Sequence, residues 1–382
     1  MIMDVFGCMY SVVYVNHLIY LRKLYTKMSA ISSINKRKLR KLAPILVLMV
    51  ALSMSFLTPI VHAQTVIATI NVGPQGPTGI DVDPITTDVW VAEAGTFTGT
   101  GHNVTVISEK TFTVTATLTG LPTSPLDVAV NTKTNRAYVT FNPFCCSNGP
   151  INGGLVVIND KDHKPLATIS PIQDPRGVAV DPLTNMIYVA SFGTTFPFNC
   201  GCVIVIDGNT NVIVTTIPVP EGPLAIAVDP VTNRIYTGDY TNEVTVIDGS
   251  TNTVITNVAV AGSQALVGLG VGVNAATNRI YVSRYFGTND VFVIDGSTNA
   301  VIADIPVGPQ SNVSGGIGVD SVTNKVYVAN ADGSVSVIDG STNSVSATVT
   351  VPSGACGVAV DARKNLVFVT SRGSAVTVIS GA

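Results

Sequence analysis

The sequence predicts an all-β fold, a seven-bladed β-propeller with four-stranded antiparallel blades. One observation is an internal repeat of about 40–50 residues, which is the length of one four-stranded blade. A second is composition, because Val, Thr, Ile and Gly dominate while only 12% of the residues are charged. A third is that the two chain ends together hold the strands of one incomplete repeat. These observations exclude a helical bundle, a coiled coil and a disordered chain.

Each repeat consists of four short apolar strands separated by Asp, Asn, Gly and Thr. In the clearest copy, residues 225–260, the first strand ends at Asp229-Pro230 and Thr232-Asn233 precedes the second. The second strand of every copy contains one aromatic residue, at intervals of 41 to 50 residues. These seven residues are Trp90, Tyr138, Tyr188, Tyr236, Tyr281, Tyr327 and Phe368.

The two ends of the chain complement each other. The seventh copy stops after its third strand, 376–379, and a matching fourth strand lies at 66–72. We therefore expect residues 64–382 to form one propeller whose last blade is completed by the N-terminal strand. Closing the ring in this way removes the open sheet edges of a linear array.

Residues 1–63 are expected to be a leader. A basic cluster at 36–41 precedes an apolar run, 42–57, and Val61-His62-Ala63, which is the order of a signal peptide. We expect a start at Met28, cleavage after Ala63 and a location outside the cytoplasm: secreted, at the cell surface or in the periplasm. The alternative is an uncleaved leader, which would be the chain's one tie to a membrane, although the run is short for a span of about 20 apolar residues.

The charge of the remaining chain bears on its partners. The leader holds eight of the 21 basic residues and one of the 24 acidic residues, which leaves 13 against 23 and a net charge near −10. A chain this acidic has no electrostatic footprint for nucleic acid.

The repeat resembles the YVTN-type β-propeller repeat proteins of bacterial and archaeal surfaces and the periplasm. Tyr327–Asn330 and Tyr138–Thr140 come closest to the motif that names this family. The resemblance implies the fold and the location, and it leaves the activity open because a propeller hosts many functions. The Val-Ile-Asp-Gly turns are equally typical of the family: Asp207, Asp248, Asp295 and Asp339.

The Asp-Pro-x-Thr-Asn and Asp-Gly-x-Thr-Asn runs are predicted to be turns and not calcium loops. Asp and Asn side chains cap turns, Pro presets φ, and Gly or Asn adopts positive φ. An EF-hand-like loop would end in a Glu, and none follows these runs.

Strand direction places these turns on one face of the ring, the lower face. The loops between second and third strands then share the upper face with the entry to the central channel. These upper loops have 11, 14 and 12 residues in blades one to three and 4 to 7 residues in the others. Long loops tend to carry function, so the predicted site lies over blades one to three. The upper-face candidates for binding are His102, Asp174, Arg176, Glu221, Arg284, Asp290 and Arg372.

The cysteines of the long loops predict a disulfide between blades two and three, because paired cysteines outside the cytoplasm are usually oxidised. The alternatives are a thiolate metal site, although the usual zinc spacing is missing, and free thiols. Cys356 is expected to be a small buried residue at the start of an inner strand. The disulfide candidates are Cys145, Cys146, Cys200 and Cys202.

Catalytic motifs are scarce. Only His102 and His163 remain without the leader, and no nucleophile elbow, zinc-protease motif or phosphate loop is present. The sequence therefore favours a non-catalytic binding scaffold for a protein, glycan or small molecule, with no resident cofactor or metal. The alternative is a propeller enzyme with a metal-assisted site at the channel mouth, a lactonase-like hydrolase or a lyase similar to the virginiamycin B lyases, which residues 73–79 resemble weakly.

Overall fold

The computed structural model describes residues 64–73, 76–94, 102–142, 152–193, 201–219, 222–240, 243–260, 267–284, 290–308, 316–352, 354–371 and 373–381, with the backbone alone at 267–269 and 284. The predicted leader and its cleavage site lie outside these residues. Among the described residues, no helix has the length and apolar character needed to cross a membrane.

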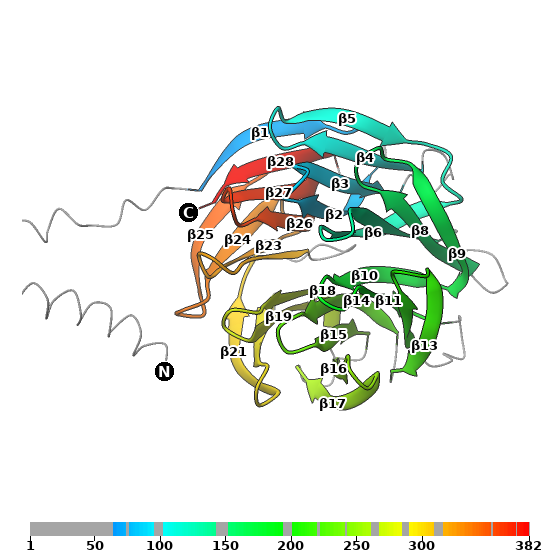
Figure 1. Cartoon of the computed structure of the whole chain (residues 1–382). Coiled ribbons are helices and arrows are strands. Elements are labelled where there is room, and N and C mark those ends of the chain that lie inside the picture. The colour runs from blue at the N-terminus through cyan, green and yellow to red at the C-terminus, as the bar shows by residue number, and fades with distance from the viewer. Residues whose placement is uncertain are drawn as a thin grey trace, which may run out of the picture. The chain divides into compact units, whose positions relative to one another are not determined.

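The described residues form seven four-stranded antiparallel sheets, arranged as the blades of a β-propeller (Figure 1). In blades 1 to 6 the strands follow one another from the channel outwards. Blade 1 comprises β2 (Pro77–Asp83), β3 (Asp88–Glu93), β4 (Asn103–Ser108) and β5 (Thr113–Leu118). Blade 2 comprises β6 (Ser124–Asn131), β7 (Arg136–Asn142), β8 (Asn152–Asn159) and β9 (Pro165–Gln173). Blade 3 comprises β10 (Pro175–Asp181), β11 (Met186–Ser191), β12 (Cys202–Asp207) and β13 (Val212–Pro218).

The remaining blades repeat this plan. Blade 4 comprises β14 (Pro223–Asp229), β15 (Arg234–Asp239), β16 (Glu243–Asp248) and β17 (Thr253–Ala259). Blade 5 comprises β18 (Val267–Asn274), β19 (Arg279–Arg284), β20 (Asp290–Asp295) and β21 (Ala300–Pro306). Blade 6 comprises β22 (Ile317–Asp320), β23 (Lys325–Ala329), β24 (Ser334–Asp339) and β25 (Ser344–Thr350). Blade 7 comprises β26 (Ala355–Asp361), β27 (Leu366–Ser371), β28 (Ala375–Ser380) and β1 (Thr65–Asn71). The predicted fold class is thus confirmed.

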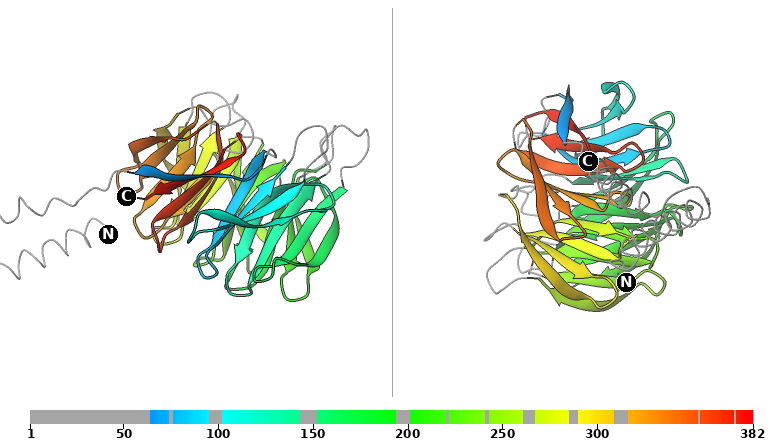
Figure 2. Two further views of the ribbon diagram at one scale, coloured as in Figure 1. Left: turned by 90° about the horizontal axis from the view of Figure 1, so that it is seen from above. Right: turned by 90° about the vertical axis from the view of Figure 1, so that its left-hand side faces the viewer.

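The N-terminal strand closes the ring as predicted. β1 pairs antiparallel with β28, from Thr65 opposite Ser380 to Asn71 opposite Ala375. Figure 1 shows the blue β1 beside the red β28, and the second view in Figure 2 shows the same pairing. Blade 7 therefore contains both ends of the described chain, and β28 has no free edge.

The strands are stable because a blade is covered on both faces. β16 is buried along Val244, Thr245, Val246 and Ile247, so its side chains pack on both neighbouring blades. The aromatic side chain of every second strand is fully buried. In blade 1 the Trp90 indole N–H also donates to Asp160 Oδ1 of blade 2 at 2.5 Å, which ties the two blades together.

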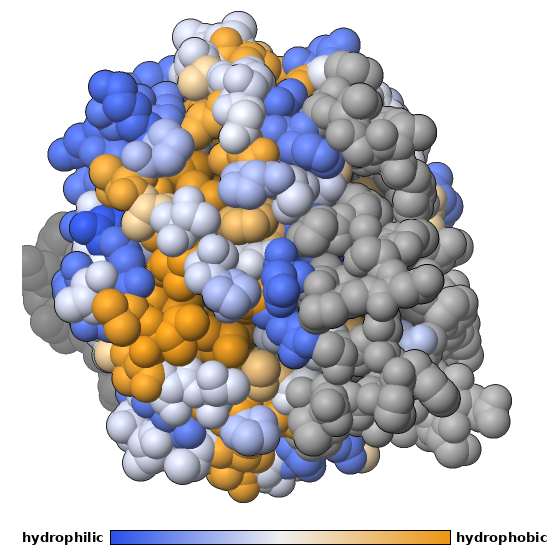
Figure 3. Space-filling view, turned by 90° about the vertical axis from the view of Figure 1, so that its right-hand side faces the viewer, coloured by the Kyte–Doolittle hydropathy of each residue, from blue (hydrophilic) through white to orange (hydrophobic). Residues whose placement is uncertain are grey.

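The outermost strands differ because only one side of each is covered. β13 begins with three exposed β-branched residues, Val212, Ile213 and Val214. Figure 3 shows apolar side chains gathered on the side of the molecule where β9 and β13 lie in Figure 1. Residues of this type favour strands, so the outer strands keep their conformation with little burial.

The repeated polar runs are turns, as the sequence predicts. The Asp229 carboxylate accepts the N–H of Val231 at 2.9 Å, and the Asp248 carboxylate accepts the N–H of Ser250 at 2.8 Å. The Asn of each Thr-Asn pair adopts the left-handed conformation, for example Asn233 with φ of 52°. Asn tolerates this conformation better than most residues, which explains why it recurs at this place in most of the turns; Thr87, Phe112 and His163 occupy the equivalent place in the others.

Candidate binding site in the central channel

The innermost strands of all seven blades surround a cavity of about 870 Å³. These strands approach one another closely, so small residues are required on their facing sides. A side chain at Gly79 would meet the Cα of Asp127 in the next blade at 2.5 Å, and one at Gly357 would meet the carbonyl oxygen of Thr78 at 2.4 Å. Glycine at these positions therefore reflects the geometry of the ring.

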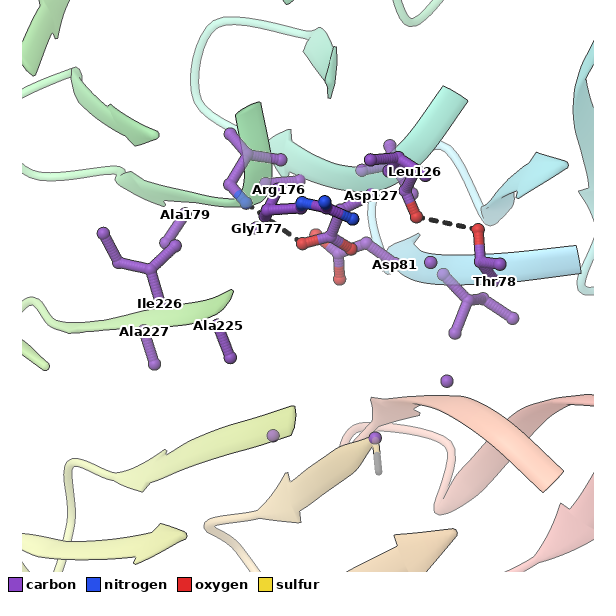
Figure 4. A pocket seen from close by; sticks show the side chains of 18 of the residues that line it. Thr78, Asp81, Leu126, Asp127, Arg176, Gly177, Ala179, Ala225, Ile226 and Ala227 are labelled. Atoms are coloured by element: carbon purple, nitrogen blue, oxygen red, sulfur yellow. Dashed lines mark hydrogen bonds between the residues drawn. The ribbon is translucent and has the colours of Figure 1, made fainter. Parts of the chain in front are cut away.

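The described lining of the cavity has two chemically different walls. Hydroxyl and charged side chains come from blades 1 to 3 alone: Thr78 and Asp81 on β2, Asp127 on β6 and Arg176 on β10. Figure 4 shows that the Arg176 guanidinium points toward the side where Asp127 and Asp81 lie, whereas Ala225, Ile226 and Ala227 lie on its other side, on the neighbouring strand β14. The lining from blades 4 to 7 consists of aliphatic side chains, glycines and the thiol of Cys356.

The two aspartates bridge neighbouring inner strands. Asp81 Oδ2 accepts the N–H of Val130 in blade 2 at 2.7 Å, and Asp127 Oδ2 accepts the N–H of Val178 in blade 3 at 3.0 Å. An innermost strand has one unpaired edge facing the channel, and each aspartate satisfies one donor of that edge. Both side chains are half-buried, so they remain open to the channel.

The same environment makes these carboxyl groups weak acids. Burial raises the pKa of Asp81 to about 7, and repulsion by Asp127 and Asp83 adds to this effect. Burial raises the pKa of Asp127 to about 6. In both cases the accepted backbone N–H groups lower the pKa by less than burial raises it. None of the described basic side chains forms an ion pair with either aspartate.

Two of the predicted site residues, Asp174 and Arg176, form an ion pair at the upper end of the channel. Arg176 Nε lies 2.9 Å from Asp174 Oδ1, and Nη2 donates to Oδ2 at 3.1 Å. The Asn142 amide also donates to this carboxylate, which is buried. The guanidinium lies 5.6 Å from the centroid of the Phe192 ring, which packs edge-on against Tyr240. These contacts fix the orientation of the one basic side chain in the described lining.

The other predicted binding residues are placed differently. His102 Nδ1 shares a hydrogen bond with Ser124 Oγ at 3.2 Å, and Asp290 is a buried residue at the start of β20, opposite Pro306. Neither belongs to the described lining of the cavity. Glu221, Arg372 and the side chain of Arg284 lie outside the described residues.

The disulfide remains a prediction, because Cys145, Cys146 and Cys200 lie outside the described residues. Cys202 is half-buried at the start of β12, between Ser191 of β11 and Pro218 of β13. Cys356 is buried at the wall of the channel, as expected. Within the described part of the chain, no three His, Cys, Asp or Glu side chains are grouped to hold a metal ion.

Asp81 and Asp127 were not among the residues that the sequence singled out. A signal for them exists in the repeat itself. Asp81 lies two residues before the Asp or Asn that ends the inner strand, and each of the other six blades has Ala or Gly at this position. Asp127 lies four residues before the Asn that ends its inner strand, and each of the other six blades has Gly or Ala at this position. A carboxylate at a position where the other repeats have a small residue therefore indicates a functional role for that side chain.

Fold and channel together define a seven-bladed β-propeller with a cavity that is polar on one wall. A scan against protein-family models finds no family that matches this chain, and a search of curated proteins finds no match either.

Proposed function

We propose that this protein is an exported, non-catalytic β-propeller of the YVTN type that binds a small ligand in its central channel, against blades 1 to 3. The observation that carries the proposal is that, in the described lining, charged groups are confined to that wall. Burying carboxyl groups without a basic partner costs free energy, and the part of the lining that the structure describes in the other four blades has no carboxyl group. A ligand that interacts with these carboxyl groups would offset this cost.

The size of the cavity supports a small molecule over a protein or a glycan chain. Pockets for small ligands typically measure about 300–1,000 Å³ and combine an apolar lining with a few polar groups, and this cavity of about 870 Å³ has both properties. The acidic net charge of the propeller argues against nucleic acid as a partner.

Obstructing the channel tests this proposal. Leu224 is half-buried and lines the apolar wall, so Leu224→Trp should fill part of the cavity and weaken any ligand found by thermal-shift screening at least tenfold. The matched control is Leu183→Trp, the same change at an exposed turn of the lower face. Ligands whose affinity is the same in both variants would contradict the proposal.

Catalysis on the same wall is a second candidate function. It is favoured by one observation, that two carboxyl groups on adjacent blades line one cavity. Burial raises their pKa to about 7 and about 6, and groups that titrate near neutral pH suit general acid–base chemistry. A panel of lactones and esters tests it. Turnover that Asp81→Asn and Asp127→Asn each reduce at least a hundredfold, with thermal unfolding preserved, would favour the enzyme over the binding scaffold, and no turnover by the folded protein would exclude it for these substrates.

A further inference from the structure

The two channel aspartates differ from the paired carboxylates elsewhere in the ring. Asp295 lies 2.7 Å from Arg279 and Asp339 lies 2.7 Å from Lys325, and both have a pKa lowered to about 2. Asp295 owes this mainly to the Ser297 hydroxyl, whereas in Asp339 the hydrogen bonds from Lys325 and Ser341 together outweigh burial. Asp81 and Asp127 have no such cation among the described residues, although they share one cavity.

The hydrogen bonds of these aspartates leave room for a further partner. The two oxygens of Asp81 accept one backbone N–H each, from Val82 and Val130. A carboxylate has about four acceptor sites, so each oxygen keeps a lone pair. The bonds to neighbouring strands also hold the carboxyl groups in place, which reduces the entropy lost when a ligand binds.

The wall opposite the aspartates restricts the rest of the ligand. It is formed by aliphatic residues such as Leu224, Ile226 and Val271, which bind an apolar body through burial of its surface. Two carboxyl groups alone fall short of the six to eight oxygens that calcium takes. The cavity is therefore better suited to an organic cation than to a bare divalent ion.

From this arrangement we infer that the ligand is an organic cation, an ammonium group on an apolar body, with the ammonium between Asp81 and Asp127 and the body against blades 4 to 7. This inference rests on the proposed binding function and adds the chemical class of the ligand. The ammonium donates hydrogen bonds to both carboxylates and supplies the positive charge that neither aspartate receives from a described basic side chain, since Arg176 is paired with Asp174. Its attraction is strengthened because the channel walls exclude much of the solvent.

The same geometry makes binding depend on pH. The two aspartates face each other, and Asp83 on β2 is a further acidic group near Asp81. Arg176 on β10 also lines the cavity and is paired with Asp174. From β26 the cavity is lined by the thiol of Cys356. The described lining from β14, β18 and β22 carries no titratable group. Protonation of Asp81 and Asp127 as the pH falls through 7 and 6 removes the negative charge, so affinity for a cation falls in that range while affinity for a neutral analogue does not.

Three probes of one size test the inference on the purified protein: 2-phenylethylamine, 2-phenylethanol and 3-phenylpropionate, measured by calorimetry at pH 8 and pH 5.5. At pH 8 we expect the amine to bind at least tenfold more tightly than the alcohol and the propionate. At pH 5.5 we expect this preference to shrink to less than threefold.

Variants assign the preference to the aspartates. Asp81→Asn and Asp127→Asn preserve the size of the side chain and one acceptor oxygen, and thermal unfolding checks that they fold. Each should reduce amine affinity about tenfold and leave the alcohol unchanged, whereas Asp162→Asn, an exposed charge on the lower face, should change neither. An amine that binds no better than the alcohol, or a preference that survives in both variants, overturns the ligand class. If the probes still bind and Leu224→Trp weakens them, the proposed function survives that failure; if none of them binds, both inferences fail for ligands of this size.

Discussion

Deletion of residues 64–72 is expected to abolish cooperative unfolding and to make the protein aggregate. Ile70 of β1 and Val72, directly after it, belong to a core that also contains Val89 of blade 1 and Phe368 of blade 7. Burial of two such side chains is worth about 1.5–3 kcal/mol each, and the ladder to β28 is lost in addition. The exposed edge of β28 would then be free to pair with other chains. Thermal unfolding and light scattering measure both effects.

A permuted chain separates loss of the strand from loss of closure. Thr65 lies opposite Ser380, so residues 65–72 can be attached after Ser380 through a turn copied from residues 208–211, which connects the equivalent strands β12 and β13. This chain should recover cooperative unfolding, because blade 7 is then built like the other six. Deletion of residues 1–63 should have no effect on the melting temperature. An unchanged melting curve after removal of 64–72 would contradict the role of β1.

The propeller is expected to become less stable as the pH rises from 5 to 8. Glu93 and Asp239 occupy the same position in their blades, three residues after the buried aromatic side chain, and both are fully buried. Burial raises the pKa of each to about 7, against ordinary values of 4.5 and 3.8, although hydroxyl groups of Thr105 and Thr245 donate to them. The folded state holds these protons more tightly than the unfolded state. The contribution of each protonated group to the free energy of unfolding is therefore fully present below its unfolded-state pKa and is lost as the pH rises through 7.

The expected effect is large. A shift of two to three pKa units corresponds to about 3 kcal/mol for each group, which lowers the melting temperature of a chain of this size by roughly 4 °C per group. The raised pKa values of Asp81, Asp127 and Asp160 act in the same direction. The carboxylates with pKa values lowered to about 2 lose their contribution only in more acidic solution and do not oppose the trend: Asp295 and Asp339.

Neutral variants measure the contribution of the two buried acids. Glu93→Gln and Asp239→Asn should each flatten the dependence of melting temperature on pH between 5 and 8, whatever they do to stability at a single pH. Asp332→Asn, at an exposed position, should leave the slope unchanged. A wild-type melting temperature that is constant or rises across this interval would show that the buried carboxyl groups are not protonated in the folded state.

The number of blades, the strand order and the closure follow from the sequence alone, for a physical reason. Propeller blades are local in sequence, since each hairpin is specified by its own apolar alternation and by turns such as Asp229–Asn233, so a repeat in the chain maps directly onto a repeat in space. The contribution of β1 also follows, because its sequence matches the strand that blade 7 lacks. For the candidate site, the strand directions predicted the upper face and, among the residues on it, Asp174 and Arg176, which form one ion pair.

Only the tertiary structure decided which side chains share the channel. Asp81 and Asp127 belong to separate repeats and meet because the ring brings the inner strands of neighbouring blades together. Their protonation depends on burial and on the absence of a basic partner among the described residues, which are properties of the assembled cavity and of no single repeat. The same is true of Glu93, whose neighbour Thr105 lies on the next strand and whose burial comes from the packing of blade on blade. Local sequence specifies the blades, whereas the chemistry of the channel arises from distances between blades that the chain sets only when the ring closes.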